Sequence, residues 1–279
     1  MKIESPNTEN WFDTNVVHHI AKCARVCYAS KVNNSPADKH LYLSLWKNGH
    51  RSMFRHAGVY YTIPEKIQIS PKAYIGATVV QEGTMYYVSA NEQSAKEYWD
   101  KRYYKYRVDY YNAFKINPFI KHKLIRYTFC INTGIDITRE YNRKSPNAIA
   151  EQSTRYVDFN KRVGIKFKKC HWMSKCNLYR KFLYKFMLKT TEWFYKISRS
   201  KFGLNLKPED ARFILPLDTM SKVVYTYTVA EWEYIINMRL FDWTGKAHPD
   251  AKIIAKQIYD ILTKKGWNID NYNETRKYK

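Results

Sequence analysis

The sequence predicts an α+β fold in which helices flank a mixed sheet. Two observations predict it: several stretches repeat apolar residues at helical spacing, and two short runs are rich in the aromatic and β-branched residues of strands. The 279 residues, 45% of them hydrophobic, are enough to bury one substantial core. We therefore expect a single domain that spans residues 1–279.

Two helices are predicted before the first strand. Residues 14–29 follow a Thr or Asn cap and repeat apolar side chains at helical spacing, namely Val16, Val17, Ile20, Ala24 and Cys27. The second helix begins at Ser35, which can cap a helix opened by Pro36, and it ends at Gly49. His50 should therefore lie just beyond a helix end.

Two runs are expected to be strands, and the segment between them an insertion. AGVYYTIP at 57–64 and LIRYTFCI at 124–131 are short, β-branched or aromatic, and bounded by Gly or Pro. We expect them to be neighbours in one sheet. Residues 65–123 have a Gly-punctuated first half and a Tyr-rich helical second half, without the composition of a linker. They are predicted to pack on the main fold.

Three further helices are predicted after the second strand. The longest, residues 177–203, is capped by Asn177 and ended by Gly203. We expect its apolar side chains to lie in the core, namely Leu178, Phe182, Phe186, Trp193 and Ile197. Residues 230–241 and 248–266 follow, the second opened by Pro249 and Asp250 and closed by Gly266.

The charge of the chain predicts an anionic ligand. Lys and Arg total 48 against 25 Asp and Glu, which gives a formal net charge of +23 and a positive field over much of the surface. The excess is concentrated at 160–201, with a density typical of surfaces that contact phosphate. Nucleic acid, nucleotides and phosphorylated or polyglutamated cofactors all fit. A solvated basic face that only keeps the protein soluble is the alternative.

The cysteines and the hydropathy exclude other classes. The chain shows no export signal, so reduced thiols are expected for its odd number of cysteines, which are Cys23, Cys27, Cys130, Cys170 and Cys176. Cys170, His171 and Cys176 lack the spacing of ordinary zinc sites, so no metal is predicted. No run reaches the roughly 20 apolar residues of a membrane span. We expect a cytoplasmic protein without membrane contact.

The densest polar cluster is the stretch TREYNRKSPNAIAEQSTRYV at 138–157. Pro146 and Asn147 break any helix, so the second half is predicted to be a loop that aims side chains and backbone N–H groups at an anion. Arginine forks suit a phosphate or a pyrimidine edge, and Glu151 can accept from a ribose hydroxyl or an imide N–H. The cluster therefore suits a nucleotide. The alternative is a surface loop held by internal ion pairs.

The spacing within this cluster resembles the flavin-dependent thymidylate synthases, the thymidylate synthase complementing proteins. That family carries Arg-His-Arg, seven residues, Ser, and then an Arg-Tyr pair. Here the frame reads Arg143, Lys144 and Ser145, seven residues, Ser153, and then Arg155 and Tyr156. The resemblance runs without a gap over 128–157.

Three more segments are similar to family motifs, in the family's order. Gly49, His50 and Ser52 match a Gly-His-x-Ser segment that precedes a strand. Residues 207–212 followed by Leu215 and Pro216 match a Glu-x-Ala-Arg-x-x-Leu-Pro element, and 232–239 followed by 247–249 resemble the terminal helix pair.

The resemblance implies an α+β fold of this family and the conversion of dUMP to dTMP. Methylenetetrahydrofolate would give the methylene group, FAD would reduce it, and NADPH would recharge the flavin. Arg239 would be the catalytic residue, which favours ionisation of the uracil ring. The dUMP contacts would be Glu140, Arg143, Glu151, Gln152, Ser153, Thr154, Arg155, Arg212 and Arg239. The FAD contacts would be His50, Ser52, Arg143, Lys144, Ser145 and Glu151. The family forms homotetramers with sites at subunit boundaries.

The departures from the family pattern lie on the flavin side or its border. Lys144 and Ser145 replace a His and an Arg, Arg55 replaces an acid, Glu140 stands where many members have Gln, and Thr228 where an Asn is frequent. One alternative is therefore a pyrimidine deoxynucleotide hydroxymethylase that omits the flavin hydride step. Another is a nucleic-acid-binding protein that uses 160–201, which we disfavour because the aromatic residues there are expected in the core.

Overall fold

The computed structural model describes residues 1–31, 35–109, 118–143 and 148–275. Its central sheet has the strand order β2-β7-β10-β8, and every pairing in it is antiparallel. The strands are β2 (Asn7–Trp11), β7 (Arg126–Gly134), β8 (Ile149–Glu151) and β10 (Met220–Thr228). A parallel pair, β1 (Lys2–Glu4) with β9 (Lys166–Lys168), stands beside it. The α+β prediction is confirmed.

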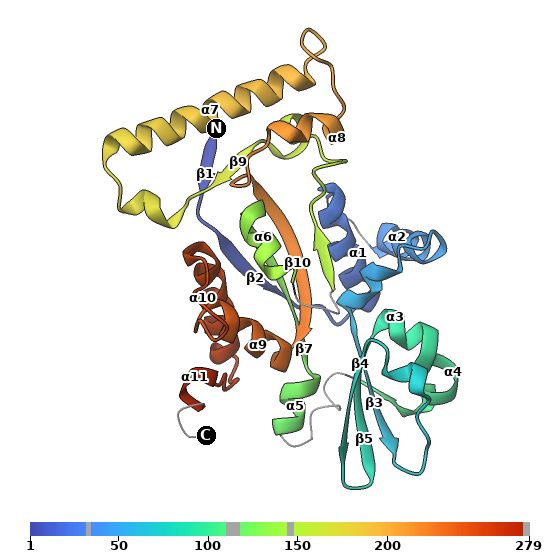
Figure 1. Ribbon diagram of the computed structural model, residues 1–279. Coiled ribbons are helices and arrows are strands. Elements are labelled where there is room, and N and C mark those ends of the chain that lie inside the picture. Colours follow the sequence, from blue (N-terminus) through green and yellow to red (C-terminus); the bar gives the residue numbers. More distant parts are fainter. Residues whose placement is uncertain (32–34, 110–117, 144–147, 276–279) are drawn as a thin grey trace.

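Helices cover both faces of the central sheet, as Figure 1 shows. α1 (Val16–Tyr28) packs on one face, while α6 (Ile135–Tyr141), α9 (Val229–Arg239) and α10 (Pro249–Lys264) pack on the other. Successive side chains of a strand point to opposite faces. Val223 and Tyr225 of β10 therefore join the core under α9 and α10, and Val224 joins the core under α1. Because both faces are covered, β10 is buried along almost its whole length.

Residues 58–108 form a second sheet with a core of its own around Trp99. Its order is β4-β5-β3-β6, with β3 (Gly58–Pro64), β4 (Ala77–Glu82), β5 (Met85–Asn91) and β6 (Arg107–Val108). The expectation that the runs 57–64 and 124–131 are neighbours is wrong. The first run, β3, pairs along its whole length with β5, the second strand of the β4–β5 hairpin. The second run lies in β7, whose two edges are occupied by β2 and β10, so that it does not pair with β3. The single domain with an insertion at 65–123 stays a prediction.

Short helices complete the second sheet and its surroundings. α3 (Glu92–Ser94), a π-helical turn (Ala95–Trp99) and α4 (Asp100–Tyr103) lie in the Tyr-rich half of the predicted insertion, so its helical character is confirmed in part. α5 (Pro118–Leu124) then leads into β7. Arg126 at the start of β7 fastens the two sheets together, because its Nε donates to Ser89 Oγ at 3.0 Å and its Nη2 to the Ser89 carbonyl at 3.3 Å.

The predicted helices all form, and two of them have the caps that were expected. Asn15 accepts from the backbone N–H of His18 at the start of α1, and Asn177 accepts from that of Arg180 at the start of α7 (Leu178–Arg199). α2 (Ser35–Lys47) is followed by Gly49, whose φ of 78° suits a residue without Cβ. α7 ends before the predicted Gly203, because Ser200 is already extended. α8 (Pro208–Ala211) and α11 (Tyr272–Thr275) are single turns.

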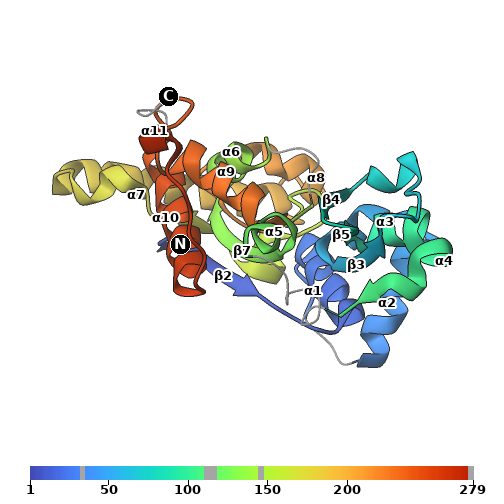
Figure 2. The ribbon, with the colours of Figure 1, turned by 90° about the horizontal axis from the view of Figure 1, so that it is seen from below.

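The core position expected for the apolar side chains of α7 is wrong. Leu178 is 83% exposed, Phe182 64%, Phe186 60% and Trp193 56%. The helix contacts the core through a different face, on which Leu188 is buried. Figures 1 and 2 show that one end of α7 extends beyond the body of the protein.

The state of the cysteines and the hydropathy of the helices are both described by the structure. All five cysteines are free, as predicted, and Cys23, Cys130 and Cys170 are buried. Burial raises the pKa of the Cys130 thiol to about 12, which keeps it protonated at neutral pH. Within the described parts of the chain, no helix combines the length and the apolar character that crossing a membrane requires.

Candidate functional site

The structure brings three of the predicted site residues together where α6 meets α9. Arg239, the last residue of α9, places Nη1 3.0 Å from Glu140 Oε2 and donates from Nη2 to the Glu140 carbonyl at 2.7 Å. Arg143 Nη2 lies 3.5 Å from the other carboxylate oxygen of Glu140. The Arg239 side chain is 12% exposed, whereas that of Arg143 is 70% exposed. Glu140 therefore fixes one arginine and leaves the other open to a ligand.

The local folding of α6 and α9 explains this geometry. A capping box formed by Thr228 and Glu231 sets the start of α9, so that its last turn delivers Arg239 to α6. The Tyr141 hydroxyl donates to the Ala251 carbonyl and so anchors the end of α6 to α10. Both helices are held by the main core, which keeps the Glu140 and Arg239 pair in place.

Glu151 is joined to the same region through Asn142, which was not among the predicted site residues. Asn142 Nδ2 donates to Glu151 Oε2 at 3.5 Å, and the Tyr225 hydroxyl donates to Asn142 Oδ1 at 2.7 Å. Tyr225 is buried, and burial raises the pKa of its hydroxyl well above the usual value. Asn142 lies inside the polar cluster, between Tyr141 and Arg143. Its position directly before the motif residue Arg143 is the feature of the sequence that could have identified it.

The segment after Glu151 forms a tight turn, so the predicted loop begins only where β8 ends. The N–H of Gln152 still bonds to the Lys222 carbonyl of β10, and Ser153 N–H bonds to the Cys27 carbonyl at the end of α1. Ser153 Oγ accepts from the N–H groups of Arg155 and Tyr156. The hydroxyl keeps its own hydrogen for a ligand, since it acts only as an acceptor in these bonds. Thr154 is half-buried in the same turn.

Arg155 connects this turn to α8. Its Nε donates to Glu209 Oε2 at 2.8 Å, and this bond raises the pKa of Arg155 and lowers the pKa of Glu209. Arg212 follows α8 and is exposed. Two sequence motifs that are more than 50 residues apart, at Arg155 and at Glu209, therefore meet in the fold.

The predicted flavin contacts are only partly described. His50 and Ser52 are exposed where α2 gives way to a 3-10 turn (Arg51–His56), and this turn packs against β8. Gly49 has open space where a Cβ would lie. Lys144 and Ser145 lie outside the described residues. Among the described residues, no hydrogen bond or ion pair links His50 or Ser52 to Glu151.

The sequence comparison with protein families settles the kinship of the chain. The model of the thymidylate synthase complementing proteins matches residues 77–265. The chain belongs to this family. The matched range contains the polar cluster, α8 and α9, so it includes the motifs at Arg143, Ser153, Arg212 and Arg239. No curated protein matches the chain.

Solved structures with distant likeness to this family member include two complexes of one enzyme. A UMP/dUMP methylase PolB from Streptomyces cacaoi bound with 5-Br dUMP has 15% identity and a TM-score of 0.46, and the match covers 95% of this chain and 93% of that one. With 5-Br UMP bound, the values are 14%, 0.45, 95% and 92%. Thymidylate Synthase X (ThyX) from Helicobacter pylori with FAD and dUMP has 16% identity and a TM-score of 0.37, over 48% of this chain and 66% of that one.

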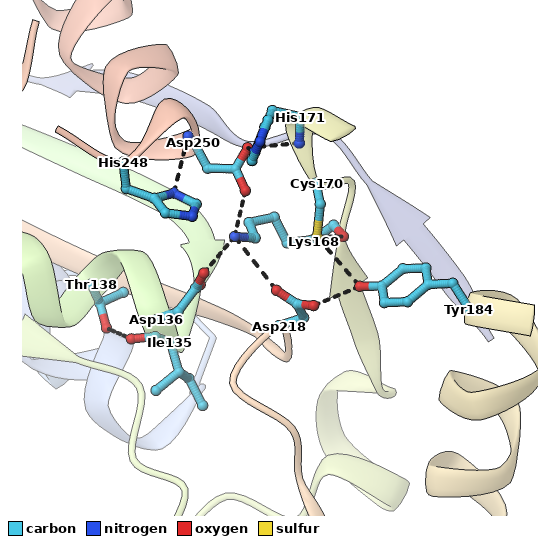
Figure 3. Close-up of polar contacts among 10 residues, drawn as sticks. All are labelled: Ile135, Asp136, Thr138, Lys168, Cys170, His171, Tyr184, Asp218, His248 and Asp250. Carbon is cyan, nitrogen blue, oxygen red and sulfur yellow. Dashed lines mark hydrogen bonds and ion pairs between the residues drawn. The ribbon is translucent and has the colours of Figure 1, made fainter. Parts of the chain in front are cut away.

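This family member also contains a buried ion cluster, shown in Figure 3, that the sequence did not predict. Lys168 of β9 is 1% exposed, and its Nζ lies 2.6 Å from Asp136 Oδ2, 2.7 Å from Asp250 Oδ2 and 3.5 Å from Asp218 Oδ1. Burial opposes the charge, but the bonds to Asp136 and Asp250 outweigh it and raise the pKa of Lys168. The cluster ties β9 to the first turns of α6 and α10.

Two cysteines and a group of possible metal ligands lie at the edge of this cluster. Cys170 Sγ contacts the Tyr184 hydroxyl, and Cys176 Sγ donates to the Met173 carbonyl, so each thiol is engaged within its own surroundings. His171, His248 and Asp250 bring possible ligand atoms within 4.8 Å of one another. Lys168 already neutralises Asp250, and the His248 ring accepts from the Asp250 N–H, so this trio is committed to internal bonds.

Proposed function

We propose that this member of the thymidylate synthase complementing family methylates dUMP to dTMP, using methylenetetrahydrofolate, FAD and NADPH. The observation that carries the proposal is the Arg239 guanidinium, held by Glu140 within a cluster of arginine, glutamate and serine side chains. Such a fixed cation can stabilise negative charge that develops on a bound pyrimidine.

The exposed arginines supply the phosphate contacts. Arg143, Arg155 and Arg212 carry guanidinium groups that are open to solvent, and a guanidinium binds phosphate through two parallel hydrogen bonds. The free hydrogen of Ser153 Oγ adds one more donor. Glu151 and Gln152 remain to accept from the ribose and to contact the edge of the ring.

Arg239 has the catalytic role. A guanidinium has five N–H groups, and only some of them are needed for the two contacts with Glu140. The others would stabilise the uracil ring in its ionised form, which raises the electron density at C5. C5 would then form a bond to the methylene carbon while that carbon's bond to a folate nitrogen breaks, the nitrogen keeping the electron pair. Loss of the C5 proton to water and cleavage of the remaining carbon–nitrogen bond would follow, so that the carbon leaves the folate. The protein needs no nucleophile of its own in this scheme.

The residues present fit the proposed flavin. His50 and Ser52 are exposed, Arg143 is 70% exposed, and the space beside Gly49 is open, so the surface offers donors and room to a flat, anionic group. His50, Ser52, Arg143 and Glu151 would hold it, together with Lys144 and Ser145. When bound, FAD would supply the hydride that reduces the transferred carbon to a methyl group.

We also propose that the chain assembles as a homotetramer with shared sites. The apolar face of α7, defined here as Tyr179, Phe182, Leu183, Phe186, Met187, Trp193 and Phe194, is exposed along the whole helix. An exposed apolar strip of this size is typical of a protein interface.

Analysis of the reaction product by mass spectrometry tests the proposal. Purified protein is incubated with dUMP, methylenetetrahydrofolate, FAD and NADPH, and we expect dTMP. A hydroxymethyl product would instead support the deoxynucleotide hydroxymethylase, which the replacement of the family's His and Arg by Lys144 and Ser145 favours. Unchanged dUMP would contradict both assignments.

A further inference from the structure

Three side chains from β10, the end of α6 and β8 form a hydrogen-bonded series beside the nucleotide site. The Tyr225 hydroxyl lies 2.7 Å from Asn142 Oδ1, and Asn142 Nδ2 lies 3.5 Å from Glu151 Oε2. Tyr225 is 1% exposed, whereas Asn142 and Glu151 are half-buried. The series therefore runs from the core of the protein to a residue that the proposed function assigns to dUMP.

The sheet and α6 bring these residues together. Glu151 lies directly opposite Val223 in the antiparallel pair of β8 and β10, and Tyr225 follows two residues later on β10. Opposed residues, and residues two apart on one strand, point to the same face, so Glu151 and Tyr225 both face α6. Asn142 ends that helix, and its backbone N–H donates to the Thr138 carbonyl at 3.0 Å. The backbone of Asn142 is thus fixed over the sheet.

The neighbours of Asn142 determine which way its amide points. An ionised carboxylate only accepts hydrogen bonds, so the amide NH2 group faces Glu151 and the amide oxygen faces Tyr225. The Tyr225 hydroxyl has one hydrogen and two possible acceptors, Asn142 Oδ1 at 2.7 Å and the Thr138 carbonyl at 3.1 Å. Because the Thr138 carbonyl already accepts from the Asn142 backbone, the hydroxyl hydrogen goes to the nearer amide oxygen. Tyr225 therefore orients Asn142.

The amide leaves one oxygen of the Glu151 carboxylate open. Asn142 bonds to Oε2, and within the described chain no hydrogen bond or ion pair engages Oε1. Glu140 differs, because its two carboxylate oxygens lie 3.0 Å from Arg239 and 3.5 Å from Arg143. Glu151 can therefore offer an acceptor to a ligand, whereas Glu140 is occupied by arginines.

We propose that Asn142 is a positioning residue of the dUMP site. The Tyr225 hydroxyl holds the Asn142 amide, the amide holds Glu151 Oε2, and Glu151 Oε1 then accepts from an N–H or O–H group of the nucleotide. An acceptor that is fixed before binding loses less side-chain freedom when the ligand arrives. This inference rests on the proposed function, because it names the residues that prepare the same site.

Calorimetric titration of the full-length protein with dUMP tests the role of Tyr225. Tyr225→Phe frees the Asn142 amide to turn, and the Kd for dUMP should rise about fivefold, as for the loss of one hydrogen bond. Tyr227→Phe is the matched control, since its hydroxyl is buried on the same strand and has no hydrogen-bond partner among the described residues. It should bind dUMP like the parent protein. In both variants kcat at saturating dUMP should stay within about twofold of the parent value.

Asn142→Asp adds a pH signature that damage to the fold would not produce. At about pH 7.5 the new carboxylate faces Glu151, and the repulsion of like charges should raise the Kd for dUMP about tenfold or more. At about pH 5 a proton shared by the two carboxyl groups restores the bridge, so the ratio of this Kd to that of the parent protein should fall about threefold or more. The other charged or titratable groups around the pair are common to both proteins, namely Glu140, Arg143, Arg239, Cys27 and Tyr225. The ratio therefore isolates the substitution.

Asn268→Asp is the matched change of charge. Asn268 Nδ2 also faces a carboxylate, Asp270 Oδ1 at 3.3 Å, but this pair lies on the exposed segment before α11. The variant should keep the Kd of the parent protein at both pH values. Because Asn142 is only half-buried, Asn142→Asp keeps the test valid if the Tyr225→Phe protein fails to fold.

Three results would overturn the proposal. They are a parent-like Kd in either folded variant of the series, an equal loss of affinity in Tyr225→Phe and Tyr227→Phe, and a loss in Asn142→Asp that does not recover at low pH. A parent protein that binds dUMP but forms no dTMP would refute the proposed function alone, because the variants are compared by binding. A parent protein that binds no dUMP would overturn both.

Discussion

Arg239 contacts Glu140 at two points, through a 3.0 Å ion pair to the carboxylate and a 2.7 Å hydrogen bond to the carbonyl. The two contacts fix both the position and the orientation of the guanidinium before any substrate arrives. A charge that is already in place needs no reorganisation when the uracil ring ionises. The proposed activity depends on this arrangement.

Replacement of Arg239 tests its catalytic role. Arg239→Ala should lower kcat by about two to three orders of magnitude, the usual effect of removing one preorganised donor, while dUMP binding stays detectable. Arg239→Lys should be intermediate, because it keeps the charge and loses the fork. Single-turnover rates and calorimetric titration with dUMP separate the two effects. Full activity of Arg239→Ala would refute the role.

Arg155 should contribute to binding more than to catalysis. Arg155→Ala removes an exposed guanidinium from the proposed phosphate site, so we expect the Kd for dUMP to rise about tenfold with kcat little changed. Glu209→Gln is the matched control: it releases Arg155 from its ion pair and should leave the affinity equal or tighter. A change in kcat alone would place Arg155 outside the phosphate site.

The apolar face of α7 should control assembly. Phe186→Glu and Trp193→Glu each place a charge on this face and should shift the protein from tetramer to smaller species in light scattering after gel filtration. Lys175→Glu, an exposed site before the helix, is the charge-change control. If all variants show the same mass as the parent protein, then another surface forms the assembly.

Lys168 should be important for stability. Lys168→Met leaves three carboxylates without their shared cation, and breaking a buried pair in this way costs about 3 to 5 kcal/mol. Lys166→Met, two residues away on the same strand, removes a 40% exposed lysine and should cost less than about 1 kcal/mol. Urea unfolding measures both variants. Equal costs would mean that the cluster does not stabilise the fold.

The buried histidines predict a loss of stability in weak acid. Burial lowers their pKa from 6.5 to about 4 for His19 and about 3 for His56, so protons bind the unfolded chain first as the pH falls below 6.5. Their stabilisation is complete above 6.5 and is lost as the pH falls toward these lower values. At about pH 5 each histidine should cost about 2 kcal/mol.

Unfolding of His19→Gln as a function of pH checks this point. The decrease in unfolding free energy between about pH 7 and pH 5 should be smaller than in the parent protein by about 2 kcal/mol. His50→Gln, at an exposed site, should follow the parent profile. Identical profiles for all three proteins would show that other groups control the acid sensitivity.

Local features of the sequence predicted the helices well, whereas the pairing of strands that are distant in the sequence was not predicted. Asn15 and Asn177 cap the helices that they were expected to cap, because a cap depends on residues three positions away. The partner of β3 could not be predicted from such local features, since β5 and β7 both have sequences typical of a strand. The place beside β3 is taken by β5, which forms a hairpin with β4 and lies much nearer to β3 in the sequence than β7 does, so that less chain entropy is lost when the pair closes.

The spacing of apolar residues also did not predict which side chains are buried. α7 has the apolar spacing of a core helix, yet Phe186 faces outward, because spacing defines a face but not what covers it. Lys168 lies in a basic run that looks like solvated surface. Its carboxylate partners are distant in the sequence, and only the fold brings them around its ammonium group. Of the site, the sequence identified Glu140 and Arg239 but not the contact between them.

The most direct test of the account is the flavin absorbance of the purified protein with added FAD. NADPH should bleach the flavin band, and the bleaching should be faster when dUMP is present, because the nucleotide and the flavin would share one site. Bleaching that depends on dUMP would support the flavin-dependent methylation. A protein that binds no flavin under these conditions would contradict it, and Lys144 and Ser145 would then mark a loss of the cofactor.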